Sequence, residues 1–281
     1  MSKPVSSRRQ SRRRSHAPAS DRAEGPLAVT PSIWWVGCGS WGGEKPLTHL
    51  GDGNIYLLRG GRFDVLIDCG GNRDVRLLER NIRLAGSDPK RVGQIWLTHS
   101  HSDHAGGAAA WQKRHPHTLC CLAPVAAKLM RQGNYRLVGT AAIGGSFEPP
   151  ARLRPLQGGR LLRCGQHELA VVPLPGHTPD CLGYRGQVDG IDCLFSGDAI
   201  IGDQGQAKGV VGWLDGLWLS SVPTYVQTLQ AVLARPPELL LPGHGYCQAG
   251  PSVRRSLKNC IARLRKVQAI PHAGTMFPFM G

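Results

Sequence analysis

The stretch Thr98–Gly107 reads THSHSDHAGG and places three histidines and one aspartate within six consecutive positions. It directly follows the apolar run Val92–Leu97, which is typical of a buried strand. Residues two apart on an extended segment point the same way, so His99 and His101 can converge on one ion as the chain leaves the sheet.

The other two ionisable residues of the stretch, Asp103 and His104, fall where a helix is expected to begin, and there they can face a second ion. The small-residue run Ala105–Ala110 lets that helix start close to the sheet and leaves room above it. This geometry is typical of a metal site at the carboxyl end of a strand. A surface histidine cluster that binds metals loosely is the alternative, but it does not explain the strand before the stretch or the helix after it.

Three later apolar runs also end in a potential ligand next to glycine. They are Leu169–Leu174 before His177, Cys193–Phe195 before Asp198, and Leu239–Leu241 before His244. Taken alone, each of these would be interpreted as a hydrogen-bonded structural histidine or a turn aspartate. Four strand ends that deliver His or Asp in order favour one common site.

The length and composition allow a well-packed core. The chain has 281 residues, of which 41% are hydrophobic, enough for one large or two ordinary domains. Nine cysteines without a regular framework, mostly inside apolar runs, indicate reduced thiols and favour a cytoplasmic location. Because no apolar stretch approaches the length of a bilayer span, and no hydrophobic segment follows the N-terminal arginines, we expect neither an anchor, nor a secretory signal, nor a membrane partner.

The formal net charge of +15 divides between a tail and the remaining chain. Residues 1–27 carry seven basic and two acidic residues, a net +5, which leaves +10 for the rest. The Ser/Arg/Ala/Pro composition predicts a disordered basic tail over 1–27 ahead of a single domain over 28–281. A nucleic-acid-binding or targeting arm is the alternative interpretation of the tail.

Strands and helices are expected to alternate, which favours an α/β layered architecture. Further strands are predicted over 33–36, 54–58, 64–69 and 119–122, and a helix over 73–84. Asp68 is polar where its strand should be apolar. It either caps the turn or accepts a hydrogen bond that orients a metal-bound histidine.

The combined motifs resemble the metallo-β-lactamase superfamily, and most of all its glyoxalase II-type hydrolases. The resemblance covers residues 30–250 and implies an α/β fold, the four-layer αββα sandwich, with a binuclear metal site along one edge of two sheets. The motifs that carry it, in the family's order, are His99-x-His101-x-Asp103-His104, Gly176-His177-Thr178-Pro179, Ser196-Gly197-Asp198 and Leu241-Pro242-Gly243-His244-Gly245.

The resemblance also implies a ligand set and a reaction. Imidazole and carboxylate ligands suit Zn²⁺, so we expect two zinc ions per chain, with iron or a mixed pair as the alternative. Two bridged ions would lower the pKa of a shared water from 15.7 toward about 7, and the hydroxide would attack an ester, thioester or lactone carbonyl. Asp103 is the predicted catalytic residue because it could also accept a hydrogen bond from that hydroxide. The implied ligands are His99, His101 and His177 for one ion, Asp103, His104 and His244 for the other, and Asp198 between them.

Three departures from the family pattern bear on the expected substrate and on the metal site. The true β-lactamases of the superfamily lack an aspartate at the position of Asp198, which argues against β-lactam hydrolysis. Only one helix, around 253–267, is expected after His244, whereas glyoxalase II carries a long C-terminal domain that binds glutathione. Asp180 replaces the family's usual glycine near His177, where it can perturb the first ion or face water.

Two segments of the chain are expected near the site. Residues 133–159 read as a long loop, and 200–221 as a lid that contacts the substrate, with core packing as the alternative for Trp213 and Trp218.

A mononuclear iron dioxygenase acting on persulfides resembles the same fold and uses part of the ligand set. The net charge of +10 that remains without residues 1–27 leaves a nucleic-acid-processing enzyme as a second alternative. The expected partner is nevertheless a small-molecule substrate, and nucleic acid is disfavoured.

Overall fold

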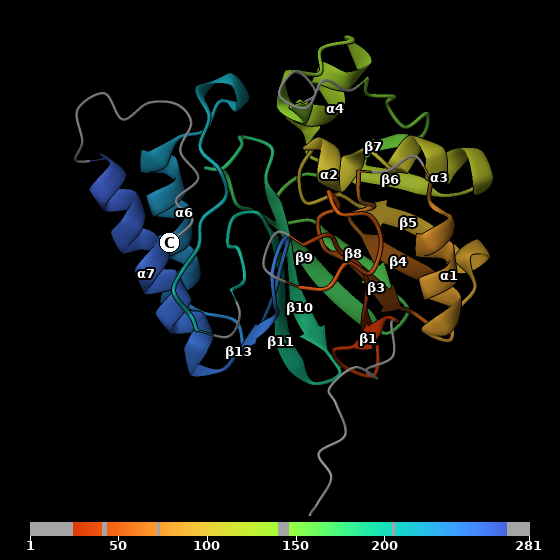
Figure 1. The fold of residues 1–281 in the computed structure, drawn as a ribbon, viewed down its shortest axis with the longest axis horizontal. Helices are drawn as coiled ribbons and strands as arrows, with labels where there is room; N and C mark the ends of the chain where they lie inside the picture. Colours follow the sequence, from red (N-terminus) through yellow and green to blue (C-terminus); the bar gives the residue numbers. More distant parts are fainter. Residues whose placement is uncertain (1–24, 41–43, 72–73, 140–145, 204–205, 269–281) are drawn as a thin grey trace, which may run out of the picture.

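Two β-sheets lie face to face at the centre of the molecule (Figure 1). The computed structural model describes residues 25–40, 44–71, 74–139, 146–203 and 206–268, and every structural statement below concerns these ranges. Most of the predicted tail, residues 1–24, therefore lies outside the described residues, as do residues 140–145 of the predicted loop.

The first sheet has seven strands in sequence order. Its first four strands pair antiparallel, and β4 to β7 pair parallel. The strands are β1 (Leu27–Ala28), β2 (Ile33–Gly37), β3 (Ile55–Arg59), β4 (Asp64–Ile67), β5 (Val92–Trp96), β6 (Leu119–Leu122) and β7 (Leu153–Pro155).

The second sheet has six strands in the order β13-β12-β11-β10-β9-β8. Its pairs are antiparallel except for β11 and β12, which run parallel. The strands are β8 (Leu161–Cys164), β9 (His167–Pro173), β10 (Leu182–Val188), β11 (Ile191–Gly197), β12 (Leu239–Pro242) and β13 (Gln248–Ala249).

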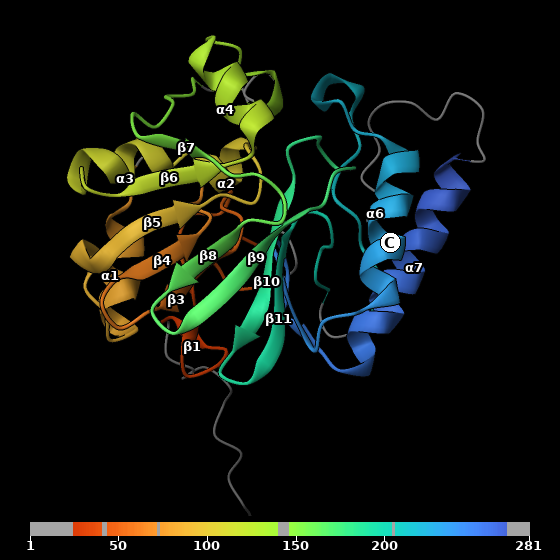
Figure 2. The ribbon, with the colours of Figure 1, turned by 180° about the vertical axis from the view of Figure 1, so that it is seen from behind.

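Helices cover the outer face of each sheet, as both views show (Figures 1 and 2). The first sheet is covered by α1 (Arg76–Leu84), α2 (Ser102–Ala105), α3 (Ala108–Arg114) and α4 (Pro124–Arg131). The second is covered by α6 (Val222–Ala234) and α7 (Pro251–Gln268). Three short 3₁₀ turns are η1 (Pro89–Arg91), η2 (Arg136–Val138) and η3 (Gly216–Trp218).

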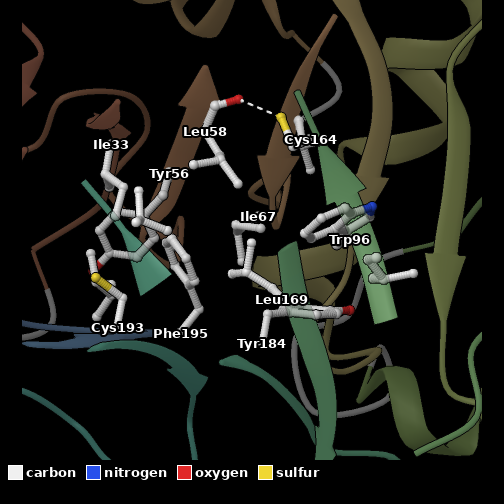
Figure 3. Packing of buried hydrophobic residues seen from close by; sticks show 14 of the residues in the cluster. Ile33, Tyr56, Leu58, Ile67, Trp96, Cys164, Leu169, Tyr184, Cys193 and Phe195 are labelled. Atoms are coloured by element: carbon white, nitrogen blue, oxygen red, sulfur yellow. Dashed lines mark hydrogen bonds between the residues drawn. The ribbon is translucent and has the colours of Figure 1, made fainter. Parts of the chain in front are cut away.

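Three apolar clusters separate these layers. The middle cluster lies between the sheets, where the Tyr56 and Phe195 rings meet edge to face with their centroids 5.5 Å apart (Figure 3). In β5 the alternation of side chains sends Trp96 into this cluster and Ile95 into the cluster under the helices of the first sheet. The predicted αββα sandwich is therefore confirmed.

Several elements differ from the predictions. The helix expected over 73–84 begins at Arg76, and the region expected to be a loop over 133–159 contains η2 and β7. The predictions missed β10, whose glycines at 183 and 186 weaken the pattern of a strand. They also missed α6, which carries no charged residue to mark an amphipathic pattern.

The cysteines agree with the prediction of reduced thiols. All nine are free, and eight of them are buried. Among the described helices, none combines the length and the apolar character that crossing a bilayer requires.

Candidate metal centre

Four strand ends meet at one edge of the two sheets. Because β11 and β12 are parallel neighbours, Asp198 and His244 follow them at the same edge, and Gly243 N donates to Gly197 O at 2.9 Å. The two sheets are joined there as well. Leu182 N, at the start of β10, donates to the carbonyl of Thr98 at 2.7 Å.

The first ligand group consists of histidines on both sheets. His99 and His101 follow β5, and His177 follows β9. Together with Asp198 their ligand atoms all lie within 4.8 Å of one another. His177 Nε2 lies 3.0 Å from His101 Nδ1, and Asp198 Oδ2 lies 3.7 Å from His177 Nε2.

The second ligand group combines two histidines with a carboxylate. His104 Nε2 lies 3.2 Å from His244 Nε2, which in turn lies 3.1 Å from Asp103 Oδ2. Asp198 reaches this group too, since its Oδ1 lies 3.3 Å from His104 Nε2 and its Oδ2 lies 3.4 Å from His244 Nε2. The structure thus brings all seven predicted site residues together, with Asp198 between the two groups.

Hydrogen bonds on the outer side of the imidazole rings set their orientation. His104 Nδ1 lies 2.8 Å from Asp68 Oδ2, and His177 Nδ1 lies 2.6 Å from the carbonyl oxygen of Trp213. His99 Nδ1 lies 3.2 Å from Thr98 Oγ1, whose hydroxyl proton goes to Asp68. Of the two interpretations of Asp68, its contacts support the one in which it orients a ligand histidine.

These outer bonds leave three imidazole lone pairs pointing inward. A neutral imidazole has a single N–H, so a ring that donates through Nδ1 presents an unprotonated Nε2. His99 Nε2 is buried and has no hydrogen-bond partner in the described part of the chain. Inward lone pairs beside carboxylates are the donor set that a divalent cation requires, and outer acceptors of this kind accompany metal-bound histidines. The residues therefore fit metal ions.

The two groups differ in their electrostatics. Burial lowers the pKa of His101 to about 3 and lowers the pKa of His99 as well. In the second group burial acts in the same direction, but the Asp198 and Asp103 carboxylates outweigh it and raise the pKa of His244 to about 9. Protons therefore compete with a cation much more strongly in the second group.

A comparison with known proteins identifies the family. The model of the metallo-beta-lactamase superfamily matches residues 49–244. The chain belongs to this superfamily. An acyl-coenzyme A thioesterase, MBLAC2, of Gallus gallus is 29% identical over 234 residues, which are 75% of this chain and 78% of that protein. A hydroxyacylglutathione hydrolase of Hahella chejuensis is 28% identical over 158 residues, 55% of this chain and 50% of that protein.

Solved structures of the superfamily share the fold. A metallo-β-lactamase of Cronobacter sakazakii superposes with a TM-score of 0.66 at 19% identity, over 87% of this chain and 98% of the other. At this identity the likeness shows the fold alone. The predicted enzyme class, a metal-dependent hydrolase of this superfamily, agrees with the names of the two relatives.

Asp180, the departure from the superfamily's usual glycine, is buried and does not face water. Its Oδ2 accepts hydrogen bonds from Ser100 N at 2.9 Å and Ser100 Oγ at 2.7 Å, and its Oδ1 accepts one from Thr178 Oγ1 at 2.6 Å. Burial raises the pKa of its carboxyl group. Since Ser100 separates His99 from His101, Asp180 ties these ligands to the segment that carries His177.

Two residues that support the site, Asn54 and Gly53, were not predicted from the sequence. Asn54 donates through Nδ2 to the carbonyls of Pro242 and Gly245, at 2.9 and 2.8 Å, and so holds the segment of His244. At Gly53 a Cβ would lie 2.5 Å from His104 Cε1, so only glycine leaves room for that ring. The available signal was a polar residue at the start of an otherwise apolar run, Asn54–Leu58.

The segment predicted as a lid lies against the first ligand group. The Trp218 ring centroid is 4.3 Å from that of His101 and 6.3 Å from that of His177. Trp213 is 39% exposed. Neither tryptophan belongs to an apolar cluster of the described chain, so their positions favour substrate contact over core packing.

Proposed function

We propose that this protein is a binuclear zinc-dependent hydrolase that cleaves a thioester with water. The observation that carries the proposal is the position of Asp198, whose oxygens lie 3.3 to 3.7 Å from histidine nitrogens of both ligand groups. A carboxylate shared by two such groups fits a pair of ions better than a single one. Among ester, thioester and lactone substrates, the names of the two relatives favour a thioester.

The inward-facing donor atoms fit two zinc ions. When bound, the ions would supply a water of lowered pKa and a Lewis acid for the carbonyl oxygen. Asp198 would be shared by both ions. The first would be held by His99, His101 and His177, and the second by Asp103, His104 and His244.

Asp103 has the most open position of the carboxylates in the centre. Its side chain is 27% exposed, whereas that of Asp198 is 8% exposed. From there Asp103 can accept a hydrogen bond from the attacking water and orient it toward a substrate carbonyl, which is the catalytic role proposed for it. A thiol leaving group has a pKa of about 8.5, so it can depart as thiolate near neutral pH without a strong proton donor.

The names of the two relatives also favour a small-molecule substrate. Asp198 argues against β-lactam hydrolysis, as expected from the sequence. The free thiols fit the proposed cytoplasmic location, where cysteines stay reduced.

Metal analysis joined to a substrate panel tests the proposal. Purified protein should contain close to two zinc ions per chain and should release thiol from acyl thioesters faster than it opens lactones or oxygen esters of the same acyl group. One iron per chain, with oxygen uptake on a persulfide, would instead establish the dioxygenase alternative.

A further inference from the structure

An apolar rim borders the first ligand group, formed by Trp213, Leu217, Trp218 and Leu219. Three of its residues are exposed: Trp213 by 39%, Leu217 by 63% and Leu219 by 47%. Trp218 adjoins Leu217 and Leu219 in the chain, and its ring centroid is 4.3 Å from that of His101. The exposed apolar residues therefore flank in sequence a tryptophan that borders the site where the proposed chemistry takes place.

The backbone of the apolar rim is held to the centre by hydrogen bonds. The carbonyl of Trp213 accepts from His177 Nδ1 at 2.6 Å, and the Asp215 carboxylate accepts from Leu217 N at 2.7 Å at the start of η3. Arg136 donates to the carbonyl of Leu217 at 2.5 Å. A fixed backbone presents these side chains in one arrangement, which reduces the entropy lost when a ligand binds to them.

Two backbone positions give the rim its shape. Gly139 has φ of 72°, and a Cβ there would lie 3.2 Å from Trp218 Nε1, so the indole ring packs directly against the backbone. Leu219 has φ of 60°, a left-handed conformation that glycine or asparagine adopts with less strain. The backbone conformation therefore gives no reason for a half-exposed leucine at this position. A ligand that covers the Leu219 side chain would give one.

The four side chains of the rim carry no charge. Arg136, an exposed cation beside them, uses two of its guanidinium N–H groups on the carbonyls of Gly216 and Leu217, and Asp215 is buried and caps η3. A hydroxylated or charged acyl group would lose hydrogen bonds to water on this surface without replacing them. Each aliphatic methylene group that a ligand buries on the rim would instead raise its affinity by up to about fourfold.

We propose that the apolar rim binds the aliphatic acyl chain of the substrate, and that Leu217 and Leu219 determine specificity for chain length. This inference rests on the proposed thioester hydrolysis. With the carbonyl at the ligand groups, the chain would run over the Trp218 ring onto the two leucines. The preferred substrates are then thioesters of unbranched aliphatic acids rather than of short hydroxy acids.

The test uses zinc-loaded full-length protein and thioesters of N-acetylcysteamine with acetyl, hexanoyl and decanoyl groups, followed by thiol release. For the wild type, kcat/KM should rise with chain length. In the double variant Leu217→Ser, Leu219→Gly, the ratio of decanoyl to acetyl kcat/KM should fall by about tenfold or more. The glycine suits the left-handed backbone, so the variant should fold. The matched control is Leu84→Ser at the end of α1, a leucine of 55% exposure, which should keep the wild-type ratio.

A second measurement separates the two proposals. It follows binding of an N-decanoyl analogue, in which NH replaces the thioester sulfur, by isothermal titration calorimetry. Turnover with an unchanged decanoyl-to-acetyl ratio in the double variant would overturn the acyl-chain site and leave thioester hydrolysis standing. Absence of turnover at every chain length would refute the hydrolysis. In that case analogue binding that the double variant loses still supports the site, and absence of analogue binding to the wild type overturns it.

Discussion

The two ligand groups of the metal centre lie along the same edge of the same sheets, yet they bind protons very differently. In the first group burial dominates and lowers the pKa of all three histidines. In the second, the carboxylates of Asp103 and Asp198 outweigh burial and raise the pKa of His104 and His244. The carboxylate of Asp103, present only in the second group, therefore helps to change histidines that would be neutral without metal into histidines that hold protons. Such histidines release their protons when a cation binds.

The largest effect should come from removing the carboxylate that distinguishes the second group. Asp103→Asn keeps the size of the side chain but removes its charge, so it should weaken the second ion and leave the attacking water poorly oriented. We expect kcat/KM to fall by about 100-fold or more, at or beyond the upper end of losses at metal-site partners. Thioester assays with metal analysis measure both effects.

A matched substitution shows whether the loss is specific to this position. Asp88 caps η1 through its side chain, and asparagine caps equally well, so Asp88→Asn should behave as the wild type. Thermal unfolding of Asp103→Asn at saturating zinc should also be close to wild type, because no buried apolar contact is lost. Near-normal turnover with two bound ions would contradict both the role of Asp103 and the mechanism.

The next largest effect should come from Asp68, which supports the second group from outside. In Asp68→Asn one oxygen can still accept from Thr98 N, which turns the new amide NH₂ toward His104 Nδ1. Two donors would then face each other, so His104 should protonate at Nε2 and lose its inward lone pair. The second ion should bind about 10- to 100-fold more weakly.

Equilibrium dialysis against zinc buffers measures this loss. The first ion should weaken less, because His177 keeps its outer bond to the Trp213 carbonyl and Asp68 reaches His99 only through the Thr98 hydroxyl. Equal weakening of both ions would show that Asp68 acts on the whole site instead of on His104.

The grouping of the seven candidate ligands could be predicted because each comes shortly after the end of an apolar run, so local patterns carry the information. The same holds for β5 (Val92–Trp96), which was predicted from the apolar run Val92–Leu97. Their environment could not be predicted in this way. The sequence offered Asp68 as an acceptor for a metal-bound histidine, but it did not show that the partner is His104, 36 positions away. The bond between His177 and the Trp213 carbonyl depends on backbone geometry that no side chain indicates. The burial of Asp180 likewise depends on how two strand ends pack.

The pH dependence of metal binding should differ between the groups. The pKa of His244 is raised to about 9, so between the usual value of 6.5 and pH 9 the second ion must displace a proton that the metal-free protein holds. Its affinity should therefore rise with pH in this window, by about tenfold per pH unit for each proton released. The first ion should show little change, because the pKa values of its histidines are lowered and those rings are already neutral there.

Calorimetric zinc titrations in two buffers with different ionisation enthalpies count the protons released at each step. Proton release should accompany the weaker binding step and be nearly absent from the stronger one at pH 7.5. The same count at both steps would remove the electrostatic distinction between the two groups.

The smallest expected effect concerns Asp180, which positions the first group through Ser100 and Thr178. Asp180→Ala removes the acceptor of three hydrogen bonds and should weaken the first ion by about tenfold, at the low end of losses at metal-site partners. Asp180→Asn should restore binding to within about threefold, because its oxygen can accept both bonds from Ser100 and its amide can donate to the Thr178 hydroxyl. The visible spectrum of protein with cobalt in the first group distinguishes positioning from stability, since a change in ligand geometry alters the spectrum in the folded protein. An unchanged spectrum in Asp180→Ala together with a lowered Tm would mean that this carboxylate only stabilises the fold and has no part in placing His99 and His101.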